Sequence, residues 1–395
     1  MSGTVSTGAL AGAQPSAAFN SIDALKGAAC LLIIGHHLAA YGPMSDVVHV
    51  VAPGLIGWLY DDARMAVQVF LVVGGFLFAA AHSRQVALAQ LGHPAAPLTN
   101  LARKVAHRFL RLAPAYWVAL LVTVAVSAAV RPWFDHPSLP DTPSWLQVAS
   151  HVFLLHDVLG QSALSAGIWY IAIDLQLYAV AVLLSGLSGH SGVGSVKVKR
   201  VLMGSTLVLT ALSLWVFNRQ SSLDITALYF FGAYGLGMLA FWTSQMSSAK
   251  DQRFWLGLLT IVALLALSVE FRPRIALALT VALALVWLQQ HRPLASAGAA
   301  VRVLGIDRFV PIPLAALAWV GKRSYSIFLI HFSVCLLFNA ALARVFPGQL
   351  LPNVLGMLAA FGASVLAGTL LYQCVEVRVR RKPAVAVMTR PAVVR

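Results

Sequence analysis

Ten apolar stretches recur along the 395-residue chain, each about long enough for a helix to cross the hydrocarbon core of a bilayer. With 59% hydrophobic and only 10% charged residues, the chain is too apolar for a soluble protein. Because backbone polar groups in lipid need partners within the protein, helices are favoured. The sequence therefore predicts an all-α polytopic membrane protein, a bundle of about ten transmembrane helices. The stretches cover approximately residues 22–42, 65–82, 113–130, 165–187, 201–218, 225–243, 254–269, 274–290, 324–343 and 353–375.

Lys and Arg are distributed unevenly between the segments that connect these stretches. If both ends of the chain are cytoplasmic, the cytoplasmic segments hold 21 Lys and Arg and the outer loops hold 6. Cytoplasmic loops of membrane proteins carry this kind of excess. The pattern predicts a multi-pass protein of the bacterial inner membrane with both termini in the cytoplasm. It also accounts for the formal net charge of +15, so no nucleic-acid partner is expected.

The apolar stretches occupy one continuous region, which predicts a single membrane domain over residues 20–378. A short disordered tail is expected over residues 1–19, and a basic cytoplasmic tail over residues 379–395. Two further apolar stretches, 145–158 and 311–320, are too short to cross the bilayer. We expect them to be re-entrant or interfacial.

The first apolar stretch carries ionisable side chains, which are costly in hydrocarbon and normally face a protein interior or an aqueous cavity. On a helix, Lys26 and His37 share one face roughly 16 Å apart along the axis, and Asp23 lies within about 40° of His37. His36 points about 100° away from His37. We predict that His37 acts in catalysis, that Asp23 orients it and that Lys26 binds phosphate. The alternative is a snorkelling lysine and a histidine hydrogen-bonded to a neighbouring helix.

A basic stripe precedes the third apolar stretch. Lys104, Arg108 and Arg111 follow i, i+4, i+7 spacing and share one helical face. Guanidinium groups bind phosphates in bidentate geometry, so we predict that Arg108 and Arg111 hold the phosphates of a nucleotide-bearing cofactor. Ordinary positive flanking of a transmembrane helix is the alternative.

Polar groups also interrupt the apolar stretches near residues 174 and 331. Asp174 is an intramembrane carboxylate with Tyr178 one turn later, which makes it a further catalytic candidate. His331 lies within an apolar run. For both side chains, a hydrogen bond to a neighbouring helix is the alternative. The three cysteines lie in apolar stretches without disulfide or zinc-ligand spacing, so no metal site is expected.

Six motifs follow one another along the chain: Ile22-Asp23-Ala24-Leu25-Lys26-Gly27 with His36-His37, Phe70 to Leu77, Arg108-x-x-Arg111 with Pro114-x-Tyr116, Trp169 to Tyr178, Gly321 to His331 with Ser324 and Tyr325, and Tyr372-x-x-x-Glu376. Together they resemble the acyltransferase 3 family of integral membrane, acyl-CoA-dependent acyltransferases. The chain departs from the family pattern at three positions, with Asp174 in place of Glu, and Tyr170 and Gly74 in place of Ser.

The resemblance implies an O-acyltransferase that moves an acyl group, most often acetyl, from cytoplasmic acyl-CoA to a hydroxyl of an extracytoplasmic or lipid-linked glycan. On this basis we hypothesise that Lys26, Arg108 and Arg111 bind the CoA phosphates and that His37 acts beside the thioester, either as a base on the acceptor hydroxyl or as a transient acyl carrier. Contacts with the acceptor are expected in outer loops such as 43–64 and 131–164. The motif residues Trp169, Tyr178, Ser324, Tyr325, His331 and Glu376 are further site candidates.

Two other functions are compatible with the residues alone. Proton-coupled transporters and flippases also use buried Lys, Asp and His, although such proteins often show two related halves, which this sequence lacks. A purely structural membrane scaffold fits poorly with intramembrane charges. The expected partners are the lipid bilayer and the glycan or lipid-linked sugar acceptor. The sequence does not identify a protein partner.

Overall fold

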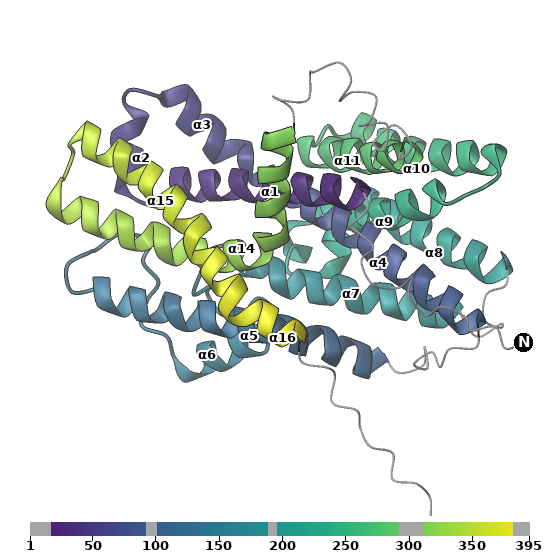
Figure 1. Cartoon of the computed structure of the whole chain (residues 1–395), viewed down its shortest axis with the longest axis horizontal. Helices are drawn as coiled ribbons and strands as arrows, with labels where there is room; N and C mark the ends of the chain where they lie inside the picture. The colour runs from purple at the N-terminus through teal and green to yellow at the C-terminus, as the bar shows by residue number, and fades with distance from the viewer. Residues whose placement is uncertain (1–16, 92–100, 189–195, 292–310, 382–395) are drawn as a thin grey trace, which may run out of the picture.

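Helices make up almost all of the computed structural model, which describes residues 17–91, 101–188, 196–291 and 311–381 (Figure 1). No strand occurs within these ranges. The predicted tails fall largely outside the described residues, and the first helix already begins at Ala17. The helices are α1 (Ala17–Ala40), α2 (Pro43–His49), α3 (Pro53–Asp61), α4 (Val67–Gln90), α5 (Leu101–Val130), α6 (Trp145–Val152), α7 (Trp169–Ser188), α8 (Val196–Trp215), α9 (Ala227–Ser244), α10 (Ala249–Val269), α11 (Pro273–Gln290), α14 (Pro311–Val345), α15 (Leu350–Leu371) and α16 (Val377–Arg381), with a π-helical turn over Tyr372–Glu376.

In the described part of the chain, nine helices are long and apolar enough to cross a membrane. They account for nine of the ten predicted stretches and confirm the polytopic all-α fold. The remaining stretch, 225–243, is the helix α9, whose glycines, tyrosines and tryptophan reduce its mean hydropathy. Most side chains of α9 are buried, because this helix packs against α4, α8 and α11 in the bundle.

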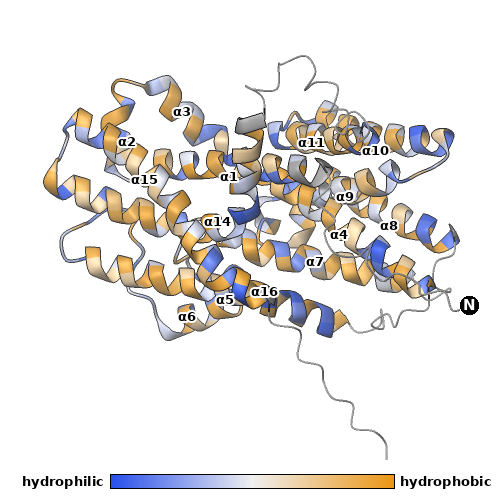
Figure 2. Cartoon of the chain, viewed as in Figure 1, coloured by the Kyte–Doolittle hydropathy of each residue, from blue (hydrophilic) through white to orange (hydrophobic). Residues whose placement is uncertain are grey.

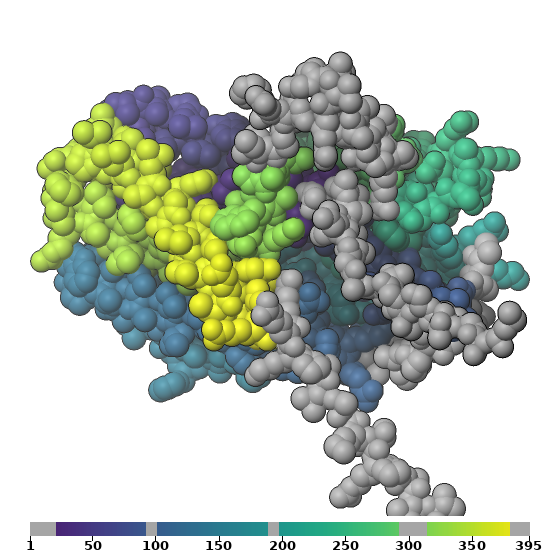
Figure 3. Space-filling view, viewed as in Figure 1, coloured from purple at the N-terminus to yellow at the C-terminus, as the bar shows by residue number. Residues whose placement is uncertain are grey.

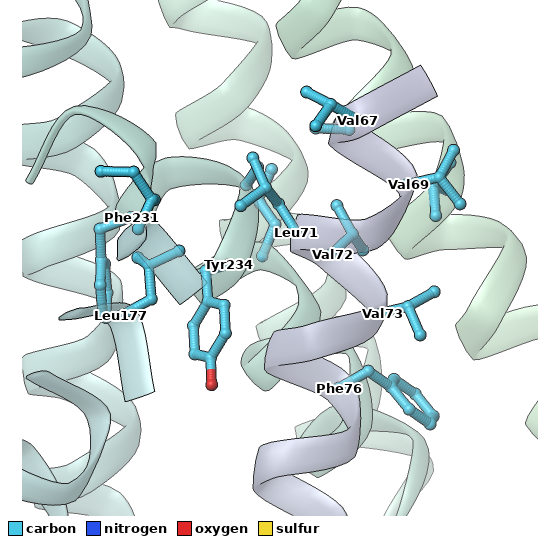
Figure 4. Packing of buried hydrophobic residues seen from close by; sticks show 14 of the residues in the cluster. Val67, Val69, Leu71, Val72, Val73, Phe76, Leu177, Phe231 and Tyr234 are labelled. Carbon is cyan, nitrogen blue, oxygen red and sulfur yellow. The ribbon is translucent and has the colours of Figure 1, made fainter. Parts of the chain in front are cut away.

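The hydrophobic core forms mainly where α4 and α9 meet. Figure 4 shows Val72 and Phe76 of α4 in the same packing region as Phe231 and Tyr234 of α9 and Leu177 of α7. Polar segments gather instead at the end of the bundle where α4 ends and α5, α8 and α10 begin (Figure 2). This separation is expected when the middle of each helix faces lipid or protein and its ends face water.

Of the two short apolar stretches, one forms a short helix of its own and the other forms the start of a long helix. Residues 145–152 form α6, which lies against the middle of α5: Tyr116 donates to the carbonyl oxygen of His151 at 2.9 Å, and Trp117 donates to that of Val152 at 3.0 Å. The stretch 311–320, expected to be re-entrant or interfacial, is not a separate element. Nothing in that sequence ends a helix, and the segment continues without a break into α14.

The last helices of the described chain, α15 and α16, lie over α5 and α14 in the space-filling view (Figure 3).

Glycines set the closest helix crossings. On α1 and α14, Gly27 and Gly321 face each other so closely that a Cβ atom on either would overlap a carbonyl oxygen of the other helix. Gly75 on α4 and Gly237 on α9 form a second crossing of the same kind. Small residues allow backbones to approach in this way within membranes. The crossing of α1 and α14 matters most for the site, because it fixes the relative position of their histidines.

Replacing Gly321 by alanine is expected to destabilise the protein by about 1–3 kcal/mol, because the new methyl group would overlap the carbonyl oxygen of Asp23. A matched control is Gly257→Ala on α10, where no atom lies within 4 Å of the added Cβ. There the change is expected to be neutral or slightly stabilising, since alanine favours helix over glycine. Thermal unfolding in detergent measures both, and equal melting temperatures would contradict the close crossing.

Candidate active site

A buried pair of histidines lies where α1 and α14 pack together. His37 and His331 are 294 residues apart in sequence, yet Nδ1 of His37 contacts Nε2 of His331 at hydrogen-bond distance. Their rings are nearly parallel, with centroids 4.7 Å apart and an interplanar angle of 5°. His37 is only 7% exposed and His331 is fully buried. The structure thus joins two site candidates that the sequence places in separate motifs.

Hydrogen bonding assigns the protons on this pair. Nδ1 of His331 lies 2.8 Å from the carbonyl oxygen of Phe328, which only accepts hydrogen bonds, so that nitrogen carries a proton. With both rings uncharged, Nε2 of His331 then has a lone pair and accepts from Nδ1 of His37. The remaining nitrogen of His37, Nε2, is left unprotonated. This tautomer presents the lone pair that a general base or a nucleophile requires.

The loop that precedes α7 passes beside His37. Gly167 in this loop has φ +81°, and a Cβ atom there would lie 3.5 Å from Cε1 of His37. His151 on α6 positions the loop, because its Nε2 accepts from the backbone N–H of Leu164 at 3.1 Å and its Nδ1 donates to Gln147 at 2.7 Å. Burial lowers the pKa of His151 to about 4, which keeps Nε2 available as an acceptor. The sequence predicts neither Gly167 nor His151 as a site residue. The glycine at position 167 is a sequence signal for a turn, whereas nothing in the local sequence marks His151.

A cavity of about 440 Å³, here called the basic cavity, opens between α4, α5, α7 and α9. The predicted basic stripe of Lys104, Arg108 and Arg111 lines it, and so does Tyr178. The wall therefore combines several positive charges with apolar and aromatic surface, which suits a ligand with both phosphates and an apolar part. The other lining residues are Gly74, Leu77, Phe78, Ala81, His82, Gln85, His107, Val182, Ser185 and Tyr234.

Arg108, which lines the basic cavity, forms an ion pair with Asp174 on α7. Nη2 of Arg108 lies 2.7 Å from Oδ2 of Asp174, and the guanidinium also lies over the ring of Tyr178 at 5.5 Å. The sequence treats Arg108 and Asp174 as parts of different motifs with different roles, whereas the structure pairs them directly. Trp169 packs against Phe230 of α9, with ring centroids 5.4 Å apart.

The remaining predicted residues on α14 tie this helix to its neighbours. Tyr325 donates to the carbonyl oxygen of Leu112 on α5 at 2.9 Å. Ser326 donates to the buried carboxylate of Glu376 at 2.6 Å. The backbone carbonyl of Ser324 accepts from the thiol of Cys30 on α1 at 3.7 Å. These contacts hold α14 in place beside the histidine pair.

On α1, Asp23 and Lys26 form an ion pair of their own at 2.8 Å. Both share a face with His37, as predicted, but Asp23 precedes His37 by 14 residues, about 21 Å along the helix axis. Lys26 is not among the residues that line the basic cavity. Within the structure, the side chain that contacts Nδ1 of His37 is His331, and neither Asp23 nor Asp174 does so.

A second cavity of about 330 Å³, here called the acidic cavity, lies at the other end of α1, beside α2 and α3. His36 is close to both this cavity and the histidine pair: its ring lies 5.0 Å from that of His37 and 6.4 Å from that of Tyr60 in the cavity wall, and its Nδ1 contacts the carbonyl oxygen of Leu59 at 3.1 Å. The lining residues are Ala39, Ala40, Gly42, Ser45, Asp46, His49, Ile56, Gly57, Tyr60, Asp61 and His136.

A family model described as an acyltransferase domain (Acyl_transf_3) matches residues 19–373, most of the chain. The chain belongs to the acyltransferase 3 family. Among curated proteins and among solved structures, no match to the chain is found. As a member of the acyltransferase 3 family with nine candidate membrane-spanning helices in its described part, the protein is a multi-pass membrane acyltransferase.

Proposed function

We propose that the protein is an O-acyltransferase of the bacterial inner membrane, with both termini in the cytoplasm. It transfers an acyl group, acetyl in the simplest case, from cytoplasmic acyl-CoA to a hydroxyl of an extracytoplasmic or lipid-linked glycan. One observation carries the proposal: His37, with a free Nε2, lies between a basic cavity and an acidic cavity at different ends of the bundle. The uneven distribution of Lys and Arg supports the orientation.

The basic cavity suits the donor. Lys104 and Arg111 offer charge-assisted hydrogen bonds to phosphates, and the apolar residues Leu77 and Phe78 offer a surface for the remainder of the molecule. Aromatic contacts connect α7, one of the helices around this cavity, with the histidines: Tyr170 packs against Phe328 at 5.5 Å and Phe328 against His331 at 5.8 Å. In this proposal Arg108 binds the donor while Asp174 holds its guanidinium in place.

His37 then serves in one of two ways. As a base, Nε2 takes the proton of the acceptor hydroxyl, the hydroxyl oxygen attacks the thioester carbonyl, the C–S bond breaks and the CoA thiolate recovers the proton from the imidazolium. As a carrier, Nε2 attacks the thioester carbonyl, the C–S bond breaks and CoA leaves as the thiolate; the acceptor hydroxyl then displaces the acyl group from the ring, and the hydroxyl proton goes to the CoA thiolate. In both schemes His331 accepts the hydrogen bond from Nδ1 of His37 and orients the ring.

Donor consumption tests the function directly. Membranes that contain the wild-type protein, given labelled acetyl-CoA, are expected to release free CoA and to transfer label to the glycan fraction. Lys104→Ala and Arg111→Ala are each expected to weaken donor affinity roughly tenfold or more, because each removes a charge-assisted hydrogen bond. The control Lys250→Ala removes an exposed charge at the start of α10, outside the basic cavity, and should leave affinity unchanged.

A different outcome would point to another function. If the wild type neither binds nor consumes any acyl-CoA tested, the transferase proposal fails. The buried His37–His331 pair and the Arg108–Asp174 pair would then favour a proton-coupled transporter or flippase, since intramembrane ionisable pairs also serve as proton relays.

A further inference from the structure

We propose that the acidic cavity is the acceptor site and that it takes a hydroxyl-rich sugar unit without anionic groups. The inference rests on the proposed function and names the chemical class of its acceptor. It follows from the charge of the cavity, from its position relative to His37 and from its size.

The charge of the acidic cavity comes from Asp46 and Asp61. Neither carboxylate forms an ion pair with any residue that the structure describes, and no Lys or Arg is among the lining residues. The neighbouring Arg64 donates its Nε–H to the backbone oxygen of Asp61 at 3.0 Å, so this hydrogen bond leaves both carboxylates available. They accept hydrogen bonds from hydroxyl groups and repel carboxylate, phosphate or sulfate groups on a ligand.

Further hydrogen-bonding groups complete the wall. His49 adds an imidazole, His136 offers its Nε2–H as a donor because its Nδ1 accepts from the backbone N–H of Ser138, Tyr60 adds a phenol, and Ser45 adds a hydroxyl group. Ser45 already donates to the carbonyl oxygen of Gly42 at 2.8 Å, which leaves its oxygen as an acceptor. A sugar ring presents several hydroxyl groups that both donate and accept, and a wall of this composition matches them.

The position of the cavity links it to the reaction. Ala39 and Ala40 form part of its wall and follow His37 on α1 within three residues, about 4.5 Å along the helix axis. The His36 ring is close to both groups, with its centroid 6.4 Å from that of Tyr60 and 5.0 Å from that of His37. A hydroxyl group held at this wall is therefore close to the histidine pair, on the side away from the basic cavity.

The size of the acidic cavity limits the ligand. About 330 Å³ is at the lower end of the range for small-molecule pockets, so the cavity suits one terminal sugar unit rather than a longer buried chain. Asp46, His49 and Asp61 are exposed, so the cavity opens outward and the rest of a glycan can extend into the surroundings.

Two glycines on α3 provide a matched steric test. Gly57 lines the acidic cavity and Gly54, one turn earlier, does not, while a Cβ atom at either position meets no atom within 4 Å. We expect Gly57→Phe to fill the cavity and lower acceptor-dependent transfer more than tenfold, with donor affinity unchanged. Gly54→Phe should retain transfer. If Gly57→Phe transfers as fast as the wild type, the acidic cavity is not the acceptor site, although the transferase function would stand.

A thiol probe measures the charge of the cavity without any knowledge of the natural acceptor. In a Cys374→Ser background, which removes the exposed native thiol, Gly57→Cys is treated with cationic, neutral and anionic methanethiosulfonate reagents of similar size. The anionic reagent is expected to react about tenfold or more slowly than the cationic one, because two unit negative charges lie nearby. Asp46→Asn with Asp61→Asn should remove most of this difference, and Gly54→Cys should show less of it. Equal rates with all three reagents at Gly57→Cys would overturn the proposal.

Transfer to matched sugars completes the test. Neutral methyl glycosides and the corresponding uronic acids are offered to the wild type with labelled acetyl-CoA. We expect at least a tenfold preference for the neutral sugars, and a smaller preference in the Asp46→Asn, Asp61→Asn variant. Equal or better transfer to the uronic acids would overturn the acceptor class. A wild type that consumes no acyl-CoA at all would instead refute the underlying function.

Discussion

Replacing His37 by alanine is expected to lower acyl transfer by about 10²- to 10⁴-fold, the usual contribution of a positioned general base. Alanine removes the Nε2 lone pair that the contact with His331 leaves available. Donor affinity should change little, because His37 does not line the basic cavity. Transfer of label from acetyl-CoA, measured at saturating donor, provides the test.

Variants of His36 and His331, the two histidines next to His37 in the structure, test the same assignment. His36→Ala should retain most of the transfer, since His36 contacts the carbonyl oxygen of Leu59 and lies on another face of α1. His331 is a positioning residue, so His331→Gln, which keeps an acceptor in reach of Nδ1, should be less damaging than His331→Ala and should shift the pH profile of transfer. If His37→Ala remains active while His36→Ala does not, the assignment of the catalytic face is incorrect.

Removing one member of the Arg108–Asp174 pair is expected to cost up to about 3–5 kcal/mol of stability, because it leaves an uncompensated charge in a low-dielectric region. The loss should be at the lower end for Asp174→Leu, since 31% of the Arg108 side chain is exposed and reaches solvent. The double variant Arg108→Leu, Asp174→Leu should recover most of the stability, because no unpaired charge remains. Thermal unfolding in detergent measures all three variants.

Donor binding separates the structural role of this pair from its functional role. The double variant is expected to be stable yet to bind acyl-CoA roughly tenfold or more weakly, because a guanidinium in the basic cavity is lost. If the double variant binds the donor as tightly as the wild type, the pair is purely structural and the donor phosphates are held elsewhere. If the double variant is no more stable than either single variant, the two charges do not compensate each other.

Local patterns in the sequence determine much of the architecture. The apolar stretches predict the transmembrane helices, because the hydrophobic length of a bilayer and the rise per residue of a helix are both fixed. The same geometry predicts that Lys104, Arg108 and Arg111 share a face, and all three line one cavity. The helix α9 is not among the nine candidate spans, and it is surrounded by protein, where glycine and tyrosine are tolerated.

Contacts between distant segments come from the tertiary structure alone. The pairing of His37 with His331, and of Arg108 with Asp174, depends on how far each helix is shifted and rotated against its neighbour. Asp23 shows the limit of reasoning within one helix, because sharing a face with His37 does not shorten the distance along the axis. Helix periodicity is a property of each segment, whereas the register between helices is decided by packing, as at Gly27 against Gly321. The sequence by itself therefore determined the helices and the faces they present, and only the tertiary structure decided which of those faces meet.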